Sequence, residues 1–240
     1  MPSSIQAVLV QRLRIAPGVF DMLFTVKSPP QLSFRAGQFV TMRVPSGTAE
    51  GFLRRSYSIA SPAHATDQIR FIVREVPGGR ASEYLLSIQP GDEIPMAGPY
   101  GIFLLDRSHP GDIVFGATGT GMAAVMPMLE ELALHPSHTP SRRLVHWGLR
   151  NEEDIFARDE IEELCRRAGA TLSLHLSAAG QDWKGHRGRI NHDLLKAVPE
   201  LNDPVFYLVG NGAMIAELKA ALIERGVDRK RQIRTESFFD

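Results

Sequence analysis

The hydrophobic period of the chain changes near Asp106, and this change constrains the fold more than any other feature. Before it, apolar and polar residues alternate with period two, as in strands that bury one face. These alternating segments are residues 5–16, 18–29, 37–45, 54–61 and 69–76. A short helical pattern, residues 81–89, follows them, and residues 90–94 open a further strand. Short strands at about ten-residue spacing predict a small antiparallel β-barrel.

Beyond Asp106, continuous apolar strands alternate with helices. The strands are predicted at residues 112–118, 142–149, 171–177 and 204–210, and the helices at 122–134, 158–169, 191–198 and 213–226. This alternation predicts a parallel sheet with helices on both faces. The boundary is expected in residues 106–112, which carry Pro and Gly. We therefore predict two domains: an antiparallel β-barrel, residues 1–106, and an α/β parallel-sheet domain, residues 107–240.

Composition narrows the class of protein. The 240 residues include 27 basic and 27 acidic ones, so a whole-molecule basic field for nucleic acid is absent. No apolar run approaches the roughly 18 residues that span a bilayer, and residues 1–18 do not read as a secretory signal. The single cysteine, Cys165, allows no disulfide and no cysteine-ligated iron–sulfur or zinc site. We expect a buried thiol, no metal centre and a reducing, cytoplasmic location.

A glycine-rich turn lies where the first strand of the second half meets its helix, in the segment IVFGATGTGMAAV, residues 113–125. Gly116, Gly119 and Gly121 leave the backbone bare near a helix N-terminus, which attracts phosphate. The alternative is a turn that only lets helix and strand pack closely. The acidic ribose-binding residue of the standard dinucleotide fingerprint is missing from residues 135–145.

Further short motifs follow one another along nearly the whole chain. They are RRSYSIAS at 54–61, GGRAS at 78–82, GPYGIF at 98–103, GATGTG at 116–121, VHWGLR at 145–150, YLVGNGAM at 207–214 and TESFFD at 235–240. In this order they resemble the ferredoxin–NAD(P)H reductase family of FAD-dependent flavoproteins. With one cysteine, the chain resembles members without a fused iron–sulfur domain.

The resemblance implies roles for the first motif. Arg55 would pair with the flavin pyrophosphate, as a guanidinium fork suits phosphate oxygens. Tyr57, on the same side of the strand, would stack on the isoalloxazine ring. Ser58 would hydrogen-bond near flavin N5, and Ser56 would also contact the cofactor, whereas Arg54 would face solvent. Taken alone, the motif favours an ordinary barrel strand with solvated arginines.

A second phosphate site is implied at the turn before the short helix. Gly79, Arg80, Ala81 and Ser82 would offer backbone N–H groups and the Ser82 hydroxyl to it. Two phosphate sites favour FAD over FMN. Ile72 is a further expected flavin contact.

The resemblance places a nicotinamide dinucleotide on the second domain. The expected contacts are Thr118, Gly119, Thr120, Gly121, Arg150, Arg189 and Gly210. Arg150 would lie near the adenosine end, or would simply be a surface arginine at a strand end. Val209 stands where many members carry a cysteine that helps to place the nicotinamide.

The choice between NADH and NADPH stays open. Arg189 matches a 2′-phosphate arginine, and Lys184 and Arg187 lie nearby in sequence. However, Ala178 stands where NADPH-using members often carry arginine, and Trp183 resembles NADH-using oxygenase reductases.

At the end of the sequence, Glu236 would lie near the nicotinamide or flavin N5, and Phe238 or Phe239 would cover the flavin. The alternative is a tail docked on the domain interface. Ser58 and Glu236 are thus the candidate catalytic residues. His146 and His175 lie in apolar strands, and we expect them to be structural.

The implied reaction moves hydride from NAD(P)H to FAD and then passes electrons singly to a separate carrier, such as a ferredoxin, a flavodoxin or an oxygenase component. An acidic carrier is expected to dock on basic residues beside the flavin: Arg12, Arg14, Arg35, Arg54 and Arg80. Two alternatives are an NAD(P)H-dependent reductase of free flavin or ferric complexes, and a non-catalytic flavin-binding electron-transfer subunit. We expect a monomer.

Overall fold

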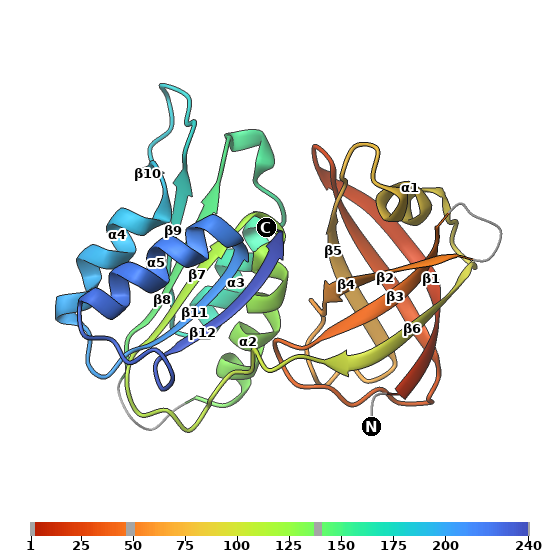
Figure 1. The fold of residues 1–240 in the computed structure, drawn as a ribbon, viewed down its shortest axis with the longest axis horizontal. Coiled ribbons are helices and arrows are strands. Elements are labelled where there is room, and N and C mark those ends of the chain that lie inside the picture. Colours follow the sequence, from red (N-terminus) through yellow and green to blue (C-terminus); the bar gives the residue numbers. More distant parts are fainter. Residues whose placement is uncertain (1–2, 47–50, 137–140, 240) are drawn as a thin grey trace. The chain divides into compact units, whose positions relative to one another are not determined.

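A computed structural model describes residues 3–46, 51–136 and 141–239, with Ser3 and Phe239 described by their backbone only. The chain divides into two compact units, of which the first ends at Leu104 and the second begins at Leu105 (Figure 1). Each unit contains its own six-stranded sheet. Among the helices of the described ranges, none is long and apolar enough to cross a membrane.

The first unit is an antiparallel sheet with one helix. Its elements are β1 (Ser3–Ala16), β2 (Val19–Ser28), β3 (Phe39–Pro45), β4 (Phe52–Ser58), β5 (Gln68–Arg74), α1 (Arg80–Ser87) and β6 (Glu93–Tyr100). The strand order is β4-β3-β6-β1-β2-β5. The sheet curls until its two edges meet, because Ala60, just after β4, donates its N–H to the Arg70 carbonyl on β5 at 2.8 Å.

The interior of this barrel follows the period-two pattern of the sequence. Along β3, Val40 and Met42 are fully buried, whereas Thr41 between them is partly exposed. Phe24 and Phe71 meet edge to face in the core, with centroids 5.7 Å apart. Because alternate residues point to opposite faces, the same pattern fixes which β4 side chains point outward.

The second unit is a parallel sheet with helices on both faces. Its main elements are β7 (Ile113–Thr118), α2 (Met122–Leu134), β8 (Arg143–Leu149), α3 (Arg158–Arg167), β9 (Thr171–Leu176), β10 (His186–Arg187), α4 (Ile190–Ala197), β11 (Val205–Asn211), α5 (Gly212–Glu224) and β12 (Ile233–Phe239). Short 3₁₀ turns lie at Gly119–Gly121, Glu152–Asp154 and Val198–Glu200. Figure 1 shows α4 and α5 in front of the sheet and α2 and α3 behind it.

The strand order of this sheet is β10-β9-β8-β7-β11-β12, and every pair is parallel. Such parallel order brings the carboxyl ends of all strands to one edge, where ligands bind in doubly wound sheets. Gly116 lets α4 approach β7, because a Cβ there would lie 2.9 Å from Leu208 Cδ2 and 3.1 Å from Leu194 Cδ1. The predicted fold class, an antiparallel barrel followed by a parallel-sheet α/β domain, is confirmed.

The segment TESFFD adopts a structure that the sequence did not suggest. Residues 235–239 lie within β12, which pairs in parallel with β11 and places Glu236 opposite Val209. From the sequence these residues were expected to contact the flavin or nicotinamide or, as the alternative, to form a tail docked on the domain interface, and no strand was predicted through Thr235, Glu236 and Ser237. An edge strand has a neighbour on one side only and tolerates such polar residues.

Candidate functional site

The strand β4 presents a cation and an aromatic ring side by side. Arg55 and Tyr57 lie on one face of the strand, and Arg55 is exposed whereas Tyr57 is half-buried. The Arg55 guanidinium donates to the Arg54 carbonyl at 2.9 Å. The Tyr57 ring meets Phe71 of β5 edge to face, with centroids 6.3 Å apart. Burial raises the pKa of Tyr57 to about 12, and the Arg55 charge opposes this only in part, so the ring is neutral at physiological pH.

The other predicted β4 contacts differ in exposure. Ser56 is exposed, and its hydroxyl lies 3.3 Å from the Thr41 hydroxyl on β3. Ser58 is buried at the end of the strand, opposite Phe39 of β3. Arg54 is exposed, as expected. Ile72 is buried on β5 and, by alternation, points to the face opposite Phe71.

The N-terminus of α1 is open for an anion. The first N–H groups of any helix have no partner within the helix. At α1 the N-cap residue is Gly79, which has no side chain that could accept a hydrogen bond from them. A Cβ at Gly79 would lie 2.8 Å from the Val76 carbonyl oxygen, which explains the glycine. The Ser82 hydroxyl accepts from the Val76 N–H at 2.9 Å and is buried. Ser82 therefore holds the turn, which the sequence did not predict.

Arg80 ties this helix end to the β3–β4 hairpin. Its guanidinium donates to the Ser46 carbonyl, and the Ser46 N–H donates to the Gly51 carbonyl at 2.8 Å. Ala81 is buried beside it. The open helix end and β4 thus belong to one neighbourhood of the barrel. An exposed guanidinium, a half-buried aromatic ring and an open helix N-terminus fit a flavin that carries two phosphates.

In the second unit, the glycine-rich turn after β7 combines two functions. Gly121 allows the turn to pack closely against β11, because a Cβ there would lie 2.9 Å from the Val209 carbonyl oxygen. Gly119 has a φ of +55° and no atom within 4 Å of the position that a Cβ would take, so a ligand can approach its backbone. The Gly119 carbonyl accepts from the Trp147 indole N–H at 3.1 Å. The two readings of the sequence, packing and ligand approach, therefore apply to different glycines.

The two threonines of this turn, both expected nucleotide contacts, differ in their surroundings. Thr118 Oγ1 accepts from the Asn211 N–H at 2.8 Å, and Thr120 is buried. Asn211 also caps α5, accepting from the Met214 N–H at 3.0 Å. Sequence analysis gave Asn211 no role, although an Asn immediately before a helix is a typical N-cap signal.

A cavity of about 630 Å³ lies between α3, β9 and the segment that leads to β10. Its lining includes Trp183, Lys184, Asp182, Arg158 and Glu162. The Trp183 indole donates to the His186 carbonyl at 3.0 Å. An aromatic ring with both charge signs around it suits a polar planar group such as a nucleotide base.

Of the predicted basic groups, only some are available to a phosphate. Arg187 donates to the carbonyl oxygens of residues 179, 180, 181 and 183, at 2.8–3.3 Å, and so folds its guanidinium into its own loop. Arg189, the N-cap of α4, pairs with Glu217 at 3.3 Å. Arg150 and Lys184 are exposed. The guanidinium of Arg150 makes no hydrogen bond or ion pair with the described residues.

The end of β12 brings the remaining candidates to the edge of the sheet. Glu236 and Phe238 are half-buried on this strand, and Ser237 pairs with Gly210 of β11. Val209, the residue in the usual cysteine position, is fully buried. Glu236 therefore lies near the carboxyl end of β11.

The two strand histidines are buried and contact each other. His146 Nδ1 and His175 Nε2 lie 3.2 Å apart. Burial, with a smaller contribution from the neighbouring histidines, lowers the pKa of each imidazole to about 4. Both rings are therefore neutral at physiological pH, in keeping with a structural role.

Comparison with known proteins assigns a family to each of the two units. Residues 6–104 match the family described as "Oxidoreductase FAD-binding domain", and residues 115–220 match "Oxidoreductase NAD-binding domain". The chain is 32% identical over 233 residues to "Ferredoxin--NADP reductase B" of Sorangium cellulosum (strain So ce56), covering 94% of each chain. It is 34% identical over 164 residues to "Propane 2-monooxygenase, reductase component" of Mycolicibacterium goodii. That match covers 67% of this chain and 45% of the relative.

Solved structures show the same fold. A cytochrome P450 reductase from Amycolatopsis superposes with a TM-score of 0.86 and 27% identity, over 99% of this chain and 70% of that one. The fold and sites thus define a flavin-dependent oxidoreductase that uses a nicotinamide nucleotide. More specifically, the chain belongs to the ferredoxin–NAD(P)H reductase family of FAD- and NAD-binding enzymes. The predicted family and cofactor class are confirmed.

Proposed function

We propose that the protein oxidises NADH and delivers the electrons, one at a time, to a separate carrier protein. When bound, FAD would accept hydride from the nicotinamide and release single electrons. The observation that carries the proposal is the pairing on β4 of an exposed Arg55 with a half-buried Tyr57, within a unit that matches a FAD-binding family.

Each barrel residue has a defined task in this proposal. Arg55 neutralises a phosphate with its planar fork of donors. Tyr57 offers a neutral ring, already held against Phe71, for stacking. The α1 N-terminus takes the second phosphate with its backbone N–H groups. Ser58, buried at the strand end, positions the reacting edge of the ring.

On the second unit, Gly119 lets the pyrophosphate approach its backbone, and Thr118 to Gly121 begin the helix that receives it. Arg150 is exposed and contacts the adenosine end. Glu236, at the end of β12, orients the nicotinamide.

The preference for NADH follows from the state of the basic groups. A 2′-phosphate carries about two negative charges and requires free cations. Arg187 is committed to four carbonyl oxygens of its own loop and Arg189 to Glu217. Around Lys184 the cavity is lined by Asp182 and by the Arg158–Glu162 ion pair, at 2.7 Å, so it offers no net positive charge to a further anion.

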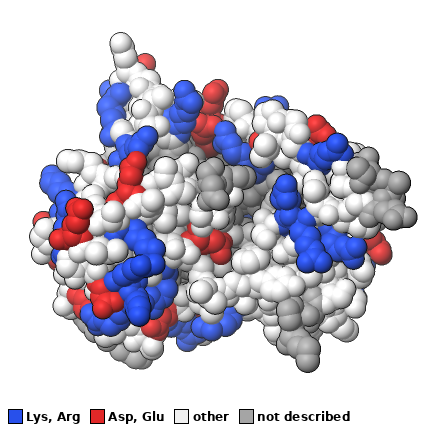
Figure 2. Space-filling view, in the orientation of Figure 1, with Lys and Arg blue, Asp and Glu red and all other residues white. Residues whose placement is uncertain are grey.

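The carrier is proposed to be an acidic protein that docks on the barrel unit. Figure 2 shows a group of basic side chains on the visible face of this unit. Arg12 is not free for docking, because it donates to the carbonyls of Leu85, Leu86 and Ile88 at the end of α1. Arg80 is likewise committed, to the Ser46 carbonyl, so the proposed surface consists of Arg14, Arg35 and Arg54. Ferredoxin reduction that does not slow at high salt contradicts it.

One preparation distinguishes this function from its alternatives. The purified protein is passed over a desalting column, and its flavin is counted by absorbance and identified after release. One FAD per chain, with NADH-dependent reduction of ferredoxin, supports the proposal. A colourless protein that reduces added free flavin indicates a flavin reductase, and a yellow protein inert to both nucleotides indicates an electron-transfer subunit. Sedimentation of the same sample tests the proposed monomer, and its single buried thiol agrees with the proposed cytoplasmic location.

A further inference from the structure

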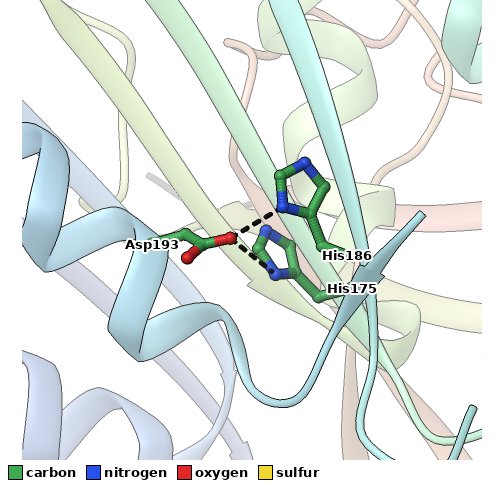
Figure 3. Close-up of side chains that lie close together, drawn as sticks. All are labelled: His175, His186 and Asp193. Carbon is green, nitrogen blue, oxygen red and sulfur yellow. Dashed lines mark hydrogen bonds and ion pairs between the residues drawn. The ribbon is translucent and has the colours of Figure 1, made fainter.

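Three side chains from separate elements converge at the outer part of the second sheet. His175 lies on β9, His186 on the neighbouring strand β10, and Asp193 in the first turn of α4. His175 and His186 are direct partners in the parallel β9–β10 pair. Figure 3 shows the carboxylate of Asp193 pointing between the two imidazole rings. His186 also lines the cavity described above, whereas His175 and Asp193 do not.

The three groups lie at nearly the separations of a metal site. Asp193 Oδ2 is 2.7 Å from His186 Nδ1 and 3.8 Å from His175 Nδ1. The three ligand atoms all lie within 4.8 Å of one another. Tetrahedral ligands at about 2.0–2.1 Å from zinc are roughly 3.4 Å apart, so His186 Nδ1 would move slightly away from Asp193 Oδ2, and Asp193 Oδ2 slightly toward His175 Nδ1, to give that geometry. His186 can make that shift, because 47% of its side chain is exposed on a two-residue strand.

His175 supplies an independent sign that a ligand is expected. Its side chain is fully buried, yet its Nδ1 has no hydrogen-bond partner among the described residues. The distance to Asp193 exceeds that of a hydrogen bond. If Nδ1 carries the proton, a buried N–H donor has no acceptor. If Nδ1 is unprotonated, its lone pair faces the negative carboxylate of Asp193. Either arrangement destabilises the fold, because a buried polar atom without a hydrogen bond loses its hydration.

A cation bound between these groups would remove the unfavourable contact between His175 Nδ1 and the Asp193 carboxylate. It would accept the Nδ1 lone pair of His175 and neutralise the Asp193 carboxylate. His175 Nε2–H would then donate to His146 Nδ1, 3.2 Å away. This outer hydrogen bond fixes the tautomer and ring orientation of a ligating histidine, as second-shell partners commonly do.

We propose that His175, His186 and Asp193 bind one divalent transition-metal ion, with zinc as the expected occupant. Two imidazoles and one carboxylate form a ligand set that suits zinc, and water completes the tetrahedron. The ion would fasten β10 and the preceding segment to β9 and α4. The site is structural, and the proposed electron transfer does not depend on it.

The experiment is a calorimetric titration of the FAD-loaded protein with ZnCl₂, after removal of metals with a chelator. The expected result is one saturable site per chain and a higher unfolding temperature with zinc. His186→Ala and Asp193→Asn each weaken zinc binding at least about tenfold. These two positions are partly exposed, so the variants retain the fold, as circular dichroism checks.

His135→Ala is the matched control. His135 has 50% of its side chain exposed and lies 3.7 Å from Glu131, so it is also a histidine beside a carboxylate, but without a third ligand among the described residues. It should leave zinc affinity unchanged. Absence of saturable binding in the unaltered protein overturns the proposal, as does equal zinc affinity in His186→Ala and His135→Ala. Either result leaves a hydrogen-bonded histidine chain that needs no ion.

Discussion

Thr118 and Asn211 lie 93 residues apart in sequence, and the Asn211 N–H donates to the Thr118 hydroxyl at 2.8 Å. This bond joins the turn after β7 to the turn after β11, the two turns that border the proposed nucleotide site. Gly210 lies between them with a φ of +116°, and a Cβ there would lie 2.4 Å from Thr118 Oγ1. The close packing of the two turns therefore requires a residue without a side chain at position 210.

Gly210→Ala should therefore destabilise the second unit. Backbone strain and overlap together lower the free energy of unfolding by about 3 kcal/mol. Gly188→Ala is the control, because Gly188 has a φ of +94° and open space around it, so only the strain of about 1 kcal/mol applies. The free energy of unfolding of both variants is measured by urea denaturation. Equal losses of stability in the two variants would contradict the close packing around Gly210.

Tyr57 and Arg54 should differ sharply in their effect on the cofactor. Tyr57→Ala removes a preorganised stacking surface worth about 1.4 kcal/mol or more, which weakens FAD binding about tenfold. Arg54→Ala changes it by less than about twofold, because this side chain is exposed. Tyr57→Phe keeps the ring and serves as the control for folding. Fluorescence titration of the flavin-free protein with FAD measures all three, and equal effects of Tyr57→Ala and Arg54→Ala refute the assigned roles.

Coenzyme preference should respond to one added arginine. Ala178 is exposed on the segment before β10, at the position where NADPH-using relatives often carry arginine. Ala178→Arg should raise the ratio of kcat/KM for NADPH to that for NADH about tenfold. Gln181→Arg adds the same charge to the same segment and should change the ratio far less. An equal change in both variants indicates a general charge effect.

Cys165 should be inert in the folded protein. It is 2% exposed, and burial, aided by the Glu162 charge, raises its thiol pKa to about 12. Iodoacetamide at about pH 8 should therefore label it only after unfolding in urea. The raised pKa means that its contribution to stability is complete below the ordinary thiol pKa and is lost as pH rises toward 12. Rapid labelling of the native protein contradicts this burial.

The sequence predicted most of the architecture because period and punctuation report burial directly. The barrel strands alternate and the parallel strands do not, and the structure follows both patterns. The strand β12 was not foreseen, because pairing with β11 is decided by tertiary contacts, and its polar residues carry no period that separates a strand from a tail.

The sequence identified which residues are candidates for the site, but it did not show which hydrogen bonds their side chains make. Exposure of Arg55 and the open backbone of Gly119 follow from the motifs. By contrast, Ser82 bonds to Val76 and Arg187 to its own loop. No spacing rule shows that a donor will be used inside the protein, because these bonds depend on how the loop closes in three dimensions.

The most direct test of the central claim is an anaerobic titration of the FAD-loaded protein with NADH, followed by oxidised ferredoxin. We predict that about one equivalent of NADH bleaches the flavin absorbance, and that about two equivalents of ferredoxin, a one-electron carrier, restore it. A flavin that stays yellow with NADH and NADPH alike, or a bleached flavin that ferredoxin does not reoxidise, would contradict this claim.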